Sequence, residues 1–337
     1  MGINKLNVII GSLLFIALLV AAEIFVRTQS ISRHIAFHPA ELVNDDIFSA
    51  KINALEGVDA PIAVLIGDSV AFGKTMSGYG YDNWQERELS AKLNERLAEN
   101  GTALRVANYA SDGLTPADFS AIIDRAIKAE VDVVILVVGL RGFSKSFEAR
   151  DERYSYGWGK TSGGKNFTKI VNKYWQTKPA LEFGLSELVG GPLNSVLTRI
   201  RKPCYSGKCE SQMPLDGIQI LQMKRRLAGI EINPDVSFQA KELSNGLKAL
   251  DGAGIPVIVV YATENPAVVS AIIKPEQLQK ARSELLTLIT HANPNSIYFL
   301  PDTSLTKDMY VDHMHLTPDG YGKMADRLAP VLIKKYR

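Results

Sequence analysis

Beyond residue 61, short apolar runs alternate with amphipathic segments, and this alternation constrains the fold more than any other feature of the sequence. The strongest run is VDVVILVV at residues 131–138, and runs of this kind are typical of strands buried on both faces. Strands that alternate with helices form parallel βαβ units. The sequence therefore predicts an α/β fold, a three-layer α/β/α sandwich around a mostly parallel five-stranded sheet. The predicted strands are residues 62–66, 104–107, 131–138, 255–261 and 296–300.

The predicted helices lie between these strands and carry an apolar stripe at helical spacing. Residues 82–100 place Leu89, Leu93 and Leu97 on one face, and Gly101 follows as a stop signal. Thr115-Pro116 is typical of a helix start, with threonine as the N-cap and proline in the first position. Further helices are predicted over residues 238–250 and 275–291 and from residue 317 onward.

Residues 8–26 form a 19-residue apolar run that only Glu23 interrupts, close to the ~20 residues that span a bilayer. We interpret residues 1–30 as a transmembrane helix that anchors the chain, and residues 31–60 as a juxtamembrane connector. The alternatives are a cleaved signal peptide, with a small-residue site at residues 20–22, and a buried core helix. The basic residues on the two sides of the run are nearly balanced, so they specify its orientation poorly.

Charge and cysteine content exclude several classes of protein. The 337-residue chain has a net charge of +2, which gives no indication of a nucleic-acid partner. Its two cysteines, Cys204 and Cys209, exclude a four-cysteine zinc site and a disulfide-rich scaffold. Their spacing suits a small disulfide-closed loop, which persists only in an oxidising compartment, and two free thiols are the alternative. With the anchor, this favours an inner-membrane protein whose body faces the periplasm.

One long stretch, residues 142–235, breaks the alternation of strands and helices. It contains 15 Lys and Arg against 9 Asp and Glu, a charge of +6, and its first part is rich in aromatic residues. Because a connection of this length is usually functional or separately packed, we interpret it as an insertion that caps the site. A structural insert with its own small core is the alternative. The sandwich domain then comprises residues 61–141 and 236–337.

Two short motifs lie where predicted strands end. Gly67-Asp68-Ser69 follows the first strand, and Asp312-His313-Met314-His315 lies between the last strand and the C-terminal helix. In an open α/β sheet, ligands bind at the carboxyl ends of the strands. A serine hydroxyl needs a base to act as a nucleophile, and an imidazole oriented by a carboxylate supplies one near neutral pH. Ser69, His315 and Asp312 are therefore the candidate nucleophile, base and orienting carboxylate.

The order and context of these motifs resemble the SGNH hydrolases, also called the GDSL family, over about residues 61–140 and 236–337. In that family the first strand ends in Gly-Asp-Ser, and Asp-x-x-His precedes a helix near the end of the chain. The resemblance implies that Gly113, after the second strand, donates a backbone N–H to an oxyanion hole together with that of Ser69. The layout is also similar to a membrane-anchored branch of the superfamily that acts in acylation of cell-envelope polymers.

The sequence departs from the family after the third strand. The family usually has Gly-x-Asn-Asp there, and its Asn is an oxyanion donor, whereas this chain has Gly139-Leu140-Arg141-Gly142. Loss of one such donor costs about 10²–10³ in rate in a well-studied protease. Three outcomes are open: Arg141 supplies the donor, a residue of the insertion supplies it, or the protein is a weak or inactive hydrolase.

Each candidate residue also has a purely structural interpretation. Asp68 and Ser69 suit a tight turn, and Gly113 suits a turn glycine. His313 has the wrong spacing from Asp312 for the family's base, so we interpret it as structural or substrate-contacting. His313 and His315 are half of a metal site, but no Cys or carboxylate cluster completes it. The chain also lacks a phosphate-binding glycine loop and a dinucleotide fingerprint, so we expect neither a metal nor a cofactor.

These observations predict a membrane-anchored, serine-dependent esterase or O-acyltransferase that acts on acyl esters, with a cell-envelope glycan as the expected substrate. Transfer to a sugar hydroxyl needs an acyl donor delivered across the membrane, so a multi-spanning acyltransferase is the expected partner. The alternative is a non-catalytic binding or assembly protein on the same scaffold. The departure at Arg141 and the basic insertion motivate that alternative.

Overall fold

The computed structural model describes residues 58–148, 227–299 and 304–336, with short pieces at residues 11–18, 21, 36–37, 39, 51–52, 54–55 and 224. Its five parallel strands form one sheet in the order β2-β1-β3-β4-β5. This confirms the predicted α/β fold with a parallel five-stranded sheet. The strands are β1 (Ile62–Gly67), β2 (Arg105–Asn108), β3 (Val133–Val138), β4 (Val257–Tyr261) and β5 (Ile297–Phe299).

The three central strands β1, β3 and β4 are buried along their whole length. Their registers bring their carboxyl ends level, because Gly67 pairs with Val137 and Val138 pairs with Tyr261. At one edge, β5 is short and only partly buried, with Ile297 exposed. The ends of β1, β3 and β4 therefore form one rigid edge from which the following loops emerge.

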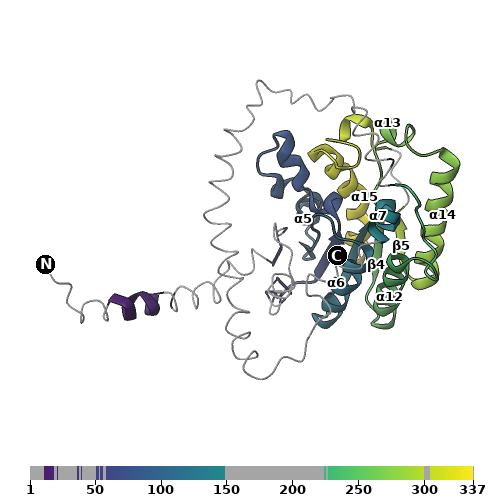
Figure 1. The fold of residues 1–337 in the computed structure, drawn as a ribbon. Helices are drawn as coiled ribbons and strands as arrows, with labels where there is room; N and C mark the ends of the chain where they lie inside the picture. Colours follow the sequence, from purple (N-terminus) through teal and green to yellow (C-terminus); the bar gives the residue numbers. More distant parts are fainter. Residues whose placement is uncertain are drawn as a thin grey trace.

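Helices cover both faces of this sheet, which gives the three predicted layers (Figure 1). One face packs against α6 (Pro116–Lys128), α12 (Phe238–Gly252) and α14 (Pro275–Ala292). The other packs against α5 (Leu89–Glu99) and α15 (Pro318–Tyr336). As predicted, α6 begins at a threonine cap followed by proline, and Thr115 forms a capping box with Asp118.

The helix predicted over residues 82–100 is shorter in the structure. A 3₁₀ turn, η2 (Trp84–Glu86), occupies the first part, and α5 begins only at Leu89. The reason is Glu88, which takes an extended conformation and accepts hydrogen bonds from the Ser90 and Ala91 N–H groups. A side chain that satisfies the first free N–H groups sets the start of a helix, and here it overrides the apolar stripe.

Parts of residues 31–60, which we interpreted as a connector, pack against the sheet domain. Ala36, Phe37, Ile52 and Leu55 are buried in the core on the α6 side. Lys51 is also buried, and its Nζ donates a hydrogen bond of 2.6 Å to the Asn108 carbonyl oxygen at the end of β2. These pieces therefore belong to the folded body.

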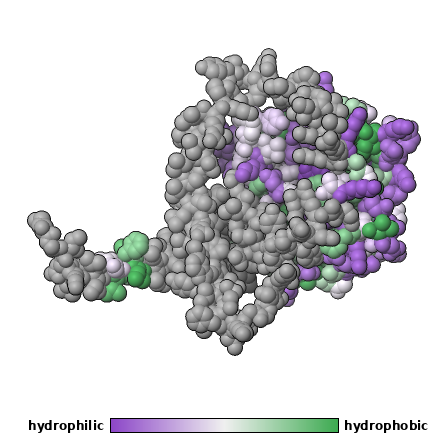
Figure 2. Space-filling model, in the orientation of Figure 1, coloured by the Kyte–Doolittle hydropathy of each residue, from purple (hydrophilic) through white to green (hydrophobic). Residues whose placement is uncertain are grey.

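Of the predicted anchor, the structure describes residues 11–18, which are helical, and residue 21. Five apolar side chains of this short helix are 55–69% exposed: Leu13, Leu14, Phe15, Ile16 and Leu18. Figure 2 shows hydrophobic, green atoms on the segment near the N-terminal end. Among the described residues, no helix has both the length and the apolar character to cross a bilayer. The remainder of residues 8–26, Cys204, Cys209 and most of the insertion lie outside the described residues.

Candidate active site

Ser69 lies where β1 ends and is the first residue of the short helix α4 (Ser69–Phe72). Asp68 caps this helix, because its Oδ1 accepts a 2.9 Å hydrogen bond from the Val70 N–H. On the other side, the Tyr321 hydroxyl of α15 donates to the Val70 carbonyl oxygen at 2.5 Å. Both polar backbone groups of Val70, the residue after Ser69, are thus fixed by hydrogen bonds to side chains.

The glycine before this turn is required by space. A Cβ on Gly67 would lie 2.6 Å from the Ala71 Cβ and 3.1 Å from the Val137 Cβ. Any side chain at this position would push α4 away from β3. Gly67 therefore lets the chain fold back sharply enough to place the Ser69 hydroxyl over the carboxyl edge of the sheet.

The Ser69 hydroxyl, the His315 ring and the Asp312 carboxylate form a continuous hydrogen-bonded chain. Ser69 Oγ is 2.8 Å from His315 Nε2, and His315 Nδ1 is 2.7 Å from Asp312 Oδ2. The other oxygen of Asp312 accepts hydrogen bonds from the Met314 and His315 N–H groups. This brings together three residues that the sequence proposed from separate motifs.

The ionisation of Asp312 determines which nitrogen of His315 carries the proton in this hydrogen-bonded series. Burial raises the pKa of Asp312, but the hydrogen bond and charge of His315, with smaller contributions from His313 and the Met314 N–H, outweigh this and hold it well below its usual range. Asp312 is therefore a carboxylate that accepts a proton-bearing Nδ1. That tautomer leaves Nε2 with a lone pair directed at the Ser69 hydroxyl.

Asn265, which sequence analysis missed, supports this loop. Its N–H donates to the His313 carbonyl oxygen at 2.9 Å, and its Nδ2 donates to the Asp312 carbonyl oxygen at 3.0 Å. Its Oδ1 also caps α13 (Pro266–Val269), just after β4. The signal in the sequence is an Asn-Pro pair soon after a strand, which marks a helix start but not its contact with residues 312–313.

The structure also brings Arg141 to Ser69. Arg141 lies in the 3₁₀ turn η3 (Leu140–Phe143) after β3. Its Nη2 is 3.1 Å from Asp68 Oδ2 and 3.4 Å from Ser69 Oγ. Its guanidinium carbon lies 5.3 Å from the centre of the Phe147 ring. A cationic donor thus stands beside the candidate nucleophile, where the family usually has an asparagine.

Gly113 lies in the loop between β2 and α6 with a φ of 75°, a left-handed conformation that favours glycine. The same loop is attached to the end of β1, since the Ser111 N–H donates to the Gly67 carbonyl oxygen at 3.2 Å. The loop therefore lies at the same sheet edge as Ser69. The role of the Gly113 N–H as an oxyanion donor stays a prediction.

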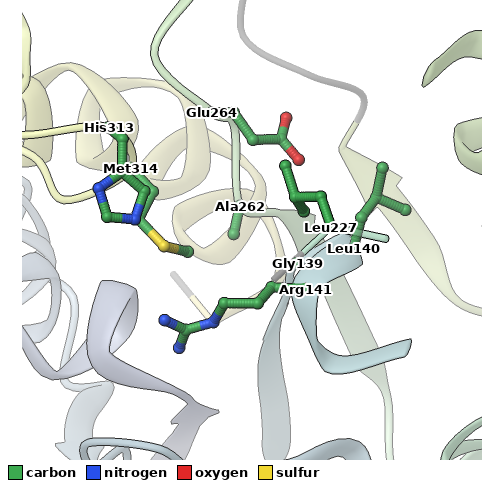
Figure 3. A pocket seen from close by; sticks show the side chains of 8 residues that line it. All are labelled: Gly139, Leu140, Arg141, Leu227, Ala262, Glu264, His313 and Met314. Carbon is green, nitrogen blue, oxygen red and sulfur yellow. The ribbon is translucent and has the colours of Figure 1, made fainter. Parts of the chain in front are cut away.

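A small, partly open pocket lies between the ends of β3 and β4, next to the candidate triad (Figure 3). Two of its residues connect it to the candidate triad. Arg141 lies beside Ser69 in space, and Met314 directly precedes His315 in the sequence. Most of the wall is apolar or small. It is lined by Gly139, Leu140, Arg141, Leu227, Ala262, Glu264, His313 and Met314.

The carboxylate in the pocket wall, Glu264, is already engaged. It is 6% exposed, accepts a 2.7 Å hydrogen bond from the Tyr261 hydroxyl, and pairs with Arg282 at 3.2 Å. Burial raises the pKa of Glu264, and these contacts oppose the rise. Within the part of the chain that the structure describes, no three His, Cys, Asp or Glu side chains are arranged to bind a metal ion.

A buried carboxylate braces the turn from behind. Glu88 accepts a 2.8 Å hydrogen bond from Asn108 Nδ2, and the same amide donates to the Ala71 carbonyl oxygen of α4 at 3.2 Å. Gly73, which ends α4, leaves room for it, since a Cβ there would lie 2.5 Å from the Glu88 Cβ. Glu88 therefore caps the start of α5 and, through Asn108 at the end of β2, is connected to α4 below the site.

No protein-family model matches the sequence, and no curated protein matches it. Similar solved structures exist. TesA is 13% identical over 81% of this chain and 98% of its own, with a TM-score of 0.42. A protein of Bacteroides fragilis named as an acylhydrolase is 10% identical over 93% of this chain and 99% of its own, with a TM-score of 0.40. A protein of Desulfitobacterium hafniense named as a lipolytic protein of the G-D-S-L family is 13% identical over 80% and 98%, with a TM-score of 0.38. These identities and TM-scores are too low to assign a function, so the functional argument is based on the geometry of the site in this chain.

Glu88 predicts a specific pH dependence of stability. Burial raises its pKa from 4.5 to about 7, against the opposing hydrogen bonds of Ser90, Ala91 and Asn108. Because the folded pKa is raised, the contribution to stability is complete below pH 4.5 and is lost as the pH rises through about 7. Between these limits we expect the free energy of unfolding of the wild type to fall by about 3 kcal/mol relative to Glu88→Gln.

Urea unfolding of both proteins at pH 4.5 and about pH 8 measures this difference, because all other groups cancel in the comparison. Glu86→Gln, an exposed carboxylate two residues away, is the matched control and should follow the wild type. Parallel pH dependences for the wild type and Glu88→Gln would contradict the prediction.

Proposed function

We propose that this protein is a serine enzyme that cleaves acyl esters through a covalent acyl-enzyme. Ser69 is the nucleophile, His315 the general base and acid, and Asp312 the group that orients His315. The observation that carries the proposal is the unbroken hydrogen-bonded chain from Ser69 Oγ through His315 to Asp312. A turn serine with only a structural role does not need a base aligned on its hydroxyl.

In the first step, Ser69 Oγ bonds to the ester carbonyl carbon, its proton passes to His315 Nε2, and the carbonyl π pair moves onto the oxygen. The tetrahedral intermediate then breaks its bond to the leaving alcohol, which takes the proton from His315. Water, deprotonated by His315, attacks the acyl-enzyme and releases a carboxylic acid and free Ser69. A sugar hydroxyl in place of water gives a new ester, so hydrolysis and transfer share these steps.

The oxyanion that forms in both steps needs donors. We propose the backbone N–H groups of Ser69 and Gly113 and the Nη2 of Arg141. The 3.4 Å separation of Nη2 and Ser69 Oγ supports the third of these, because the oxyanion and Oγ are bonded to the same carbon. Arg141 then supplies the donor that the third block of the family takes from asparagine.

We propose that the pocket between β3 and β4 holds the acyl group of the substrate. It begins at Arg141 beside Ser69, and its wall is mostly apolar, through Leu140, Leu227, Ala262 and Met314. The pocket is small and partly open, so it suits a short acyl chain rather than a long one. Short-chain esters are therefore the proposed substrate class.

The membrane anchor over residues 8–26 remains part of the proposal. Its support is the apolar run in the sequence and the exposed apolar side chains of residues 11–18. The glycan acceptor stays a prediction, since the basic, aromatic stretch over residues 142–235 that suits a glycan lies mostly outside the described residues. The multi-spanning partner also stays a prediction, because it follows from the need to deliver an acyl donor across the membrane.

An activated serine predicts covalent labelling by a fluorophosphonate probe. We expect the full-length protein in detergent to be labelled, Ser69→Ala to remain unlabelled, and His315→Ala to react about 10²–10⁴ times more slowly. The label is quantified by in-gel fluorescence. His291→Ala removes an exposed histidine of α14 and should label like the wild type. A folded wild type that takes no label would favour the non-catalytic binding protein.

The proposed acyl pocket predicts opposite shifts in chain-length preference. Leu227→Ala widens the pocket and should raise kcat/KM for butyryl and hexanoyl p-nitrophenyl esters relative to acetyl. Ala262→Val narrows it and should lower this ratio, by about 10-fold or more per excluded methylene. Unchanged ratios in both variants, with activity retained, would place the acyl group elsewhere while leaving the serine mechanism intact.

The anchor predicts how the protein partitions in cells. The full chain should sediment with membranes and resist extraction by alkaline carbonate, and deletion of residues 1–30 should move it to the supernatant, because the apolar run supplies most of the membrane affinity. Immunoblotting of the fractions measures this. Release of the intact chain by carbonate would rule out a spanning helix.

A further inference from the structure

We propose that Asp68 is a positioning residue for catalysis, which holds the Arg141 guanidinium at the oxyanion position beside Ser69. The inference rests on the proposed function, since it concerns the reaction at Ser69. It assigns a task to the middle residue of the Gly-Asp-Ser turn beyond capping α4, and it explains how an arginine can stand where asparagine is usual.

A single nitrogen of Arg141 contacts both Asp68 and Ser69, and this supports the positioning role of Asp68. Arg141 Nη2 is 3.1 Å from Asp68 Oδ2 and 3.4 Å from Ser69 Oγ. A guanidinium Nη carries two hydrogens, so one can stay on the carboxylate while the other is directed at the reacting centre. The bond to Asp68 therefore fixes the direction of the N–H that faces Ser69.

Burial makes the pairing necessary. The side chains of Arg141 and Asp68 are 11% and 9% exposed, so either charge alone would be poorly solvated. Among the described residues, Arg141 forms its one ion pair with Asp68, and its buried Nε has no hydrogen-bond partner. The guanidinium carbon lies over the Phe147 ring, 5.3 Å from its centre, and a ring offers no hydrogen-bond acceptor that would orient single N–H groups in its plane. In the part of the chain that the structure describes, Ser69 Oγ at 3.4 Å is the other acceptor near this nitrogen, and the bond to Asp68 is the shorter and charge-assisted one, so Asp68 contributes most to the choice of this rotamer.

Asp68 uses its two oxygens for different tasks, which allows the tasks to be separated. Oδ1 accepts from the Val70 N–H and caps α4, whereas Oδ2 binds Arg141. Asparagine keeps a carbonyl oxygen for the cap but presents an NH₂ group, a donor, to the guanidinium. Asp68→Asn therefore releases Arg141 while the turn that carries Ser69 keeps its cap.

The test is a double-mutant cycle on the full-length protein in detergent, with kcat and KM for p-nitrophenyl acetate. We expect Arg141→Gln to lower kcat about 10²-fold and Asp68→Asn about 10-fold, both with little change in KM, because the donor acts on the oxyanion and not on the bound ester. If Asp68 acts through Arg141, the double variant should be no slower than Arg141→Gln alone.

Two conservative variants give a further readout. Asp68→Glu keeps an anionic partner and should retain more activity than Asp68→Asn, and Arg141→Lys should exceed Arg141→Gln because it keeps a cationic donor. They also serve if Asp68→Asn fails to fold, which thermal unfolding of every variant would reveal. Arg96→Gln breaks a different Arg–Asp pair, the exposed one with Asp326 on α5 and α15, and should leave kcat unchanged.

Multiplicative losses in the double variant, or equal activities of Asp68→Glu and Asp68→Asn in folded proteins, would overturn the role of Asp68. Those results would still leave an active wild type with an activated Ser69. An inactive wild type that takes no fluorophosphonate label would instead reject the proposed function, and this inference with it. The two failures are thus distinguished by the wild type itself.

Discussion

The direction of the strands is the constraint on which the rest of the structure depends. Because all five strands are parallel, their carboxyl ends share one edge, and the loops after β1, β2, β3 and β4 begin there. Burial of β1, β3 and β4 on both faces holds these ends rigidly. Ser69, Arg141 and Asn265 come from three such loops, and the C-terminal loop brings His315 to the same edge. The loop of Gly113 is attached there through Ser111 and Gly67. A polar site at one edge of the sheet is thus a consequence of the topology.

The polar groups of this site are mutually dependent because most of them are buried. An unsatisfied donor or acceptor away from water costs about 1–3 kcal/mol, and an unpaired charge costs more. Asp312 is satisfied by His315 and two N–H groups, and the backbone of its loop is held by Asn265. Glu88 is satisfied in the same way below α4. In such a network one change of residue type is tolerated only where a neighbour provides a matching charge or hydrogen bond.

Much of this arrangement could be predicted from the sequence. The parts that could not be predicted have a common physical cause. Apolar runs reveal strands and the Thr115-Pro116 pair reveals a helix start, because both signals are local. The helix over residues 82–100 was predicted too long, since the buried cap of Glu88 outweighs periodicity. The contacts of Asn265 with residue 312 and of Asp68 with Arg141 join loops 47 and 73 residues apart, and no periodicity records them. The burial of Phe37 and Lys51 against the body was missed for the same reason.

An arginine at the position where the SGNH resemblance predicts an asparagine changes the electrostatics of the site as well as its donors. A neutral amide offers a hydrogen bond without a net charge, whereas a guanidinium adds a cation that a buried site must balance. Asp68 provides that balance at 3.1 Å, so the pair is neutral overall while one N–H stays directed at Ser69. A charged donor stabilises an oxyanion more strongly than a neutral one, but a nearby carboxylate offsets part of that gain. The pair therefore has the same net charge as a neutral amide. The departure in the third block is, on this argument, compatible with catalysis and does not by itself favour a non-catalytic scaffold.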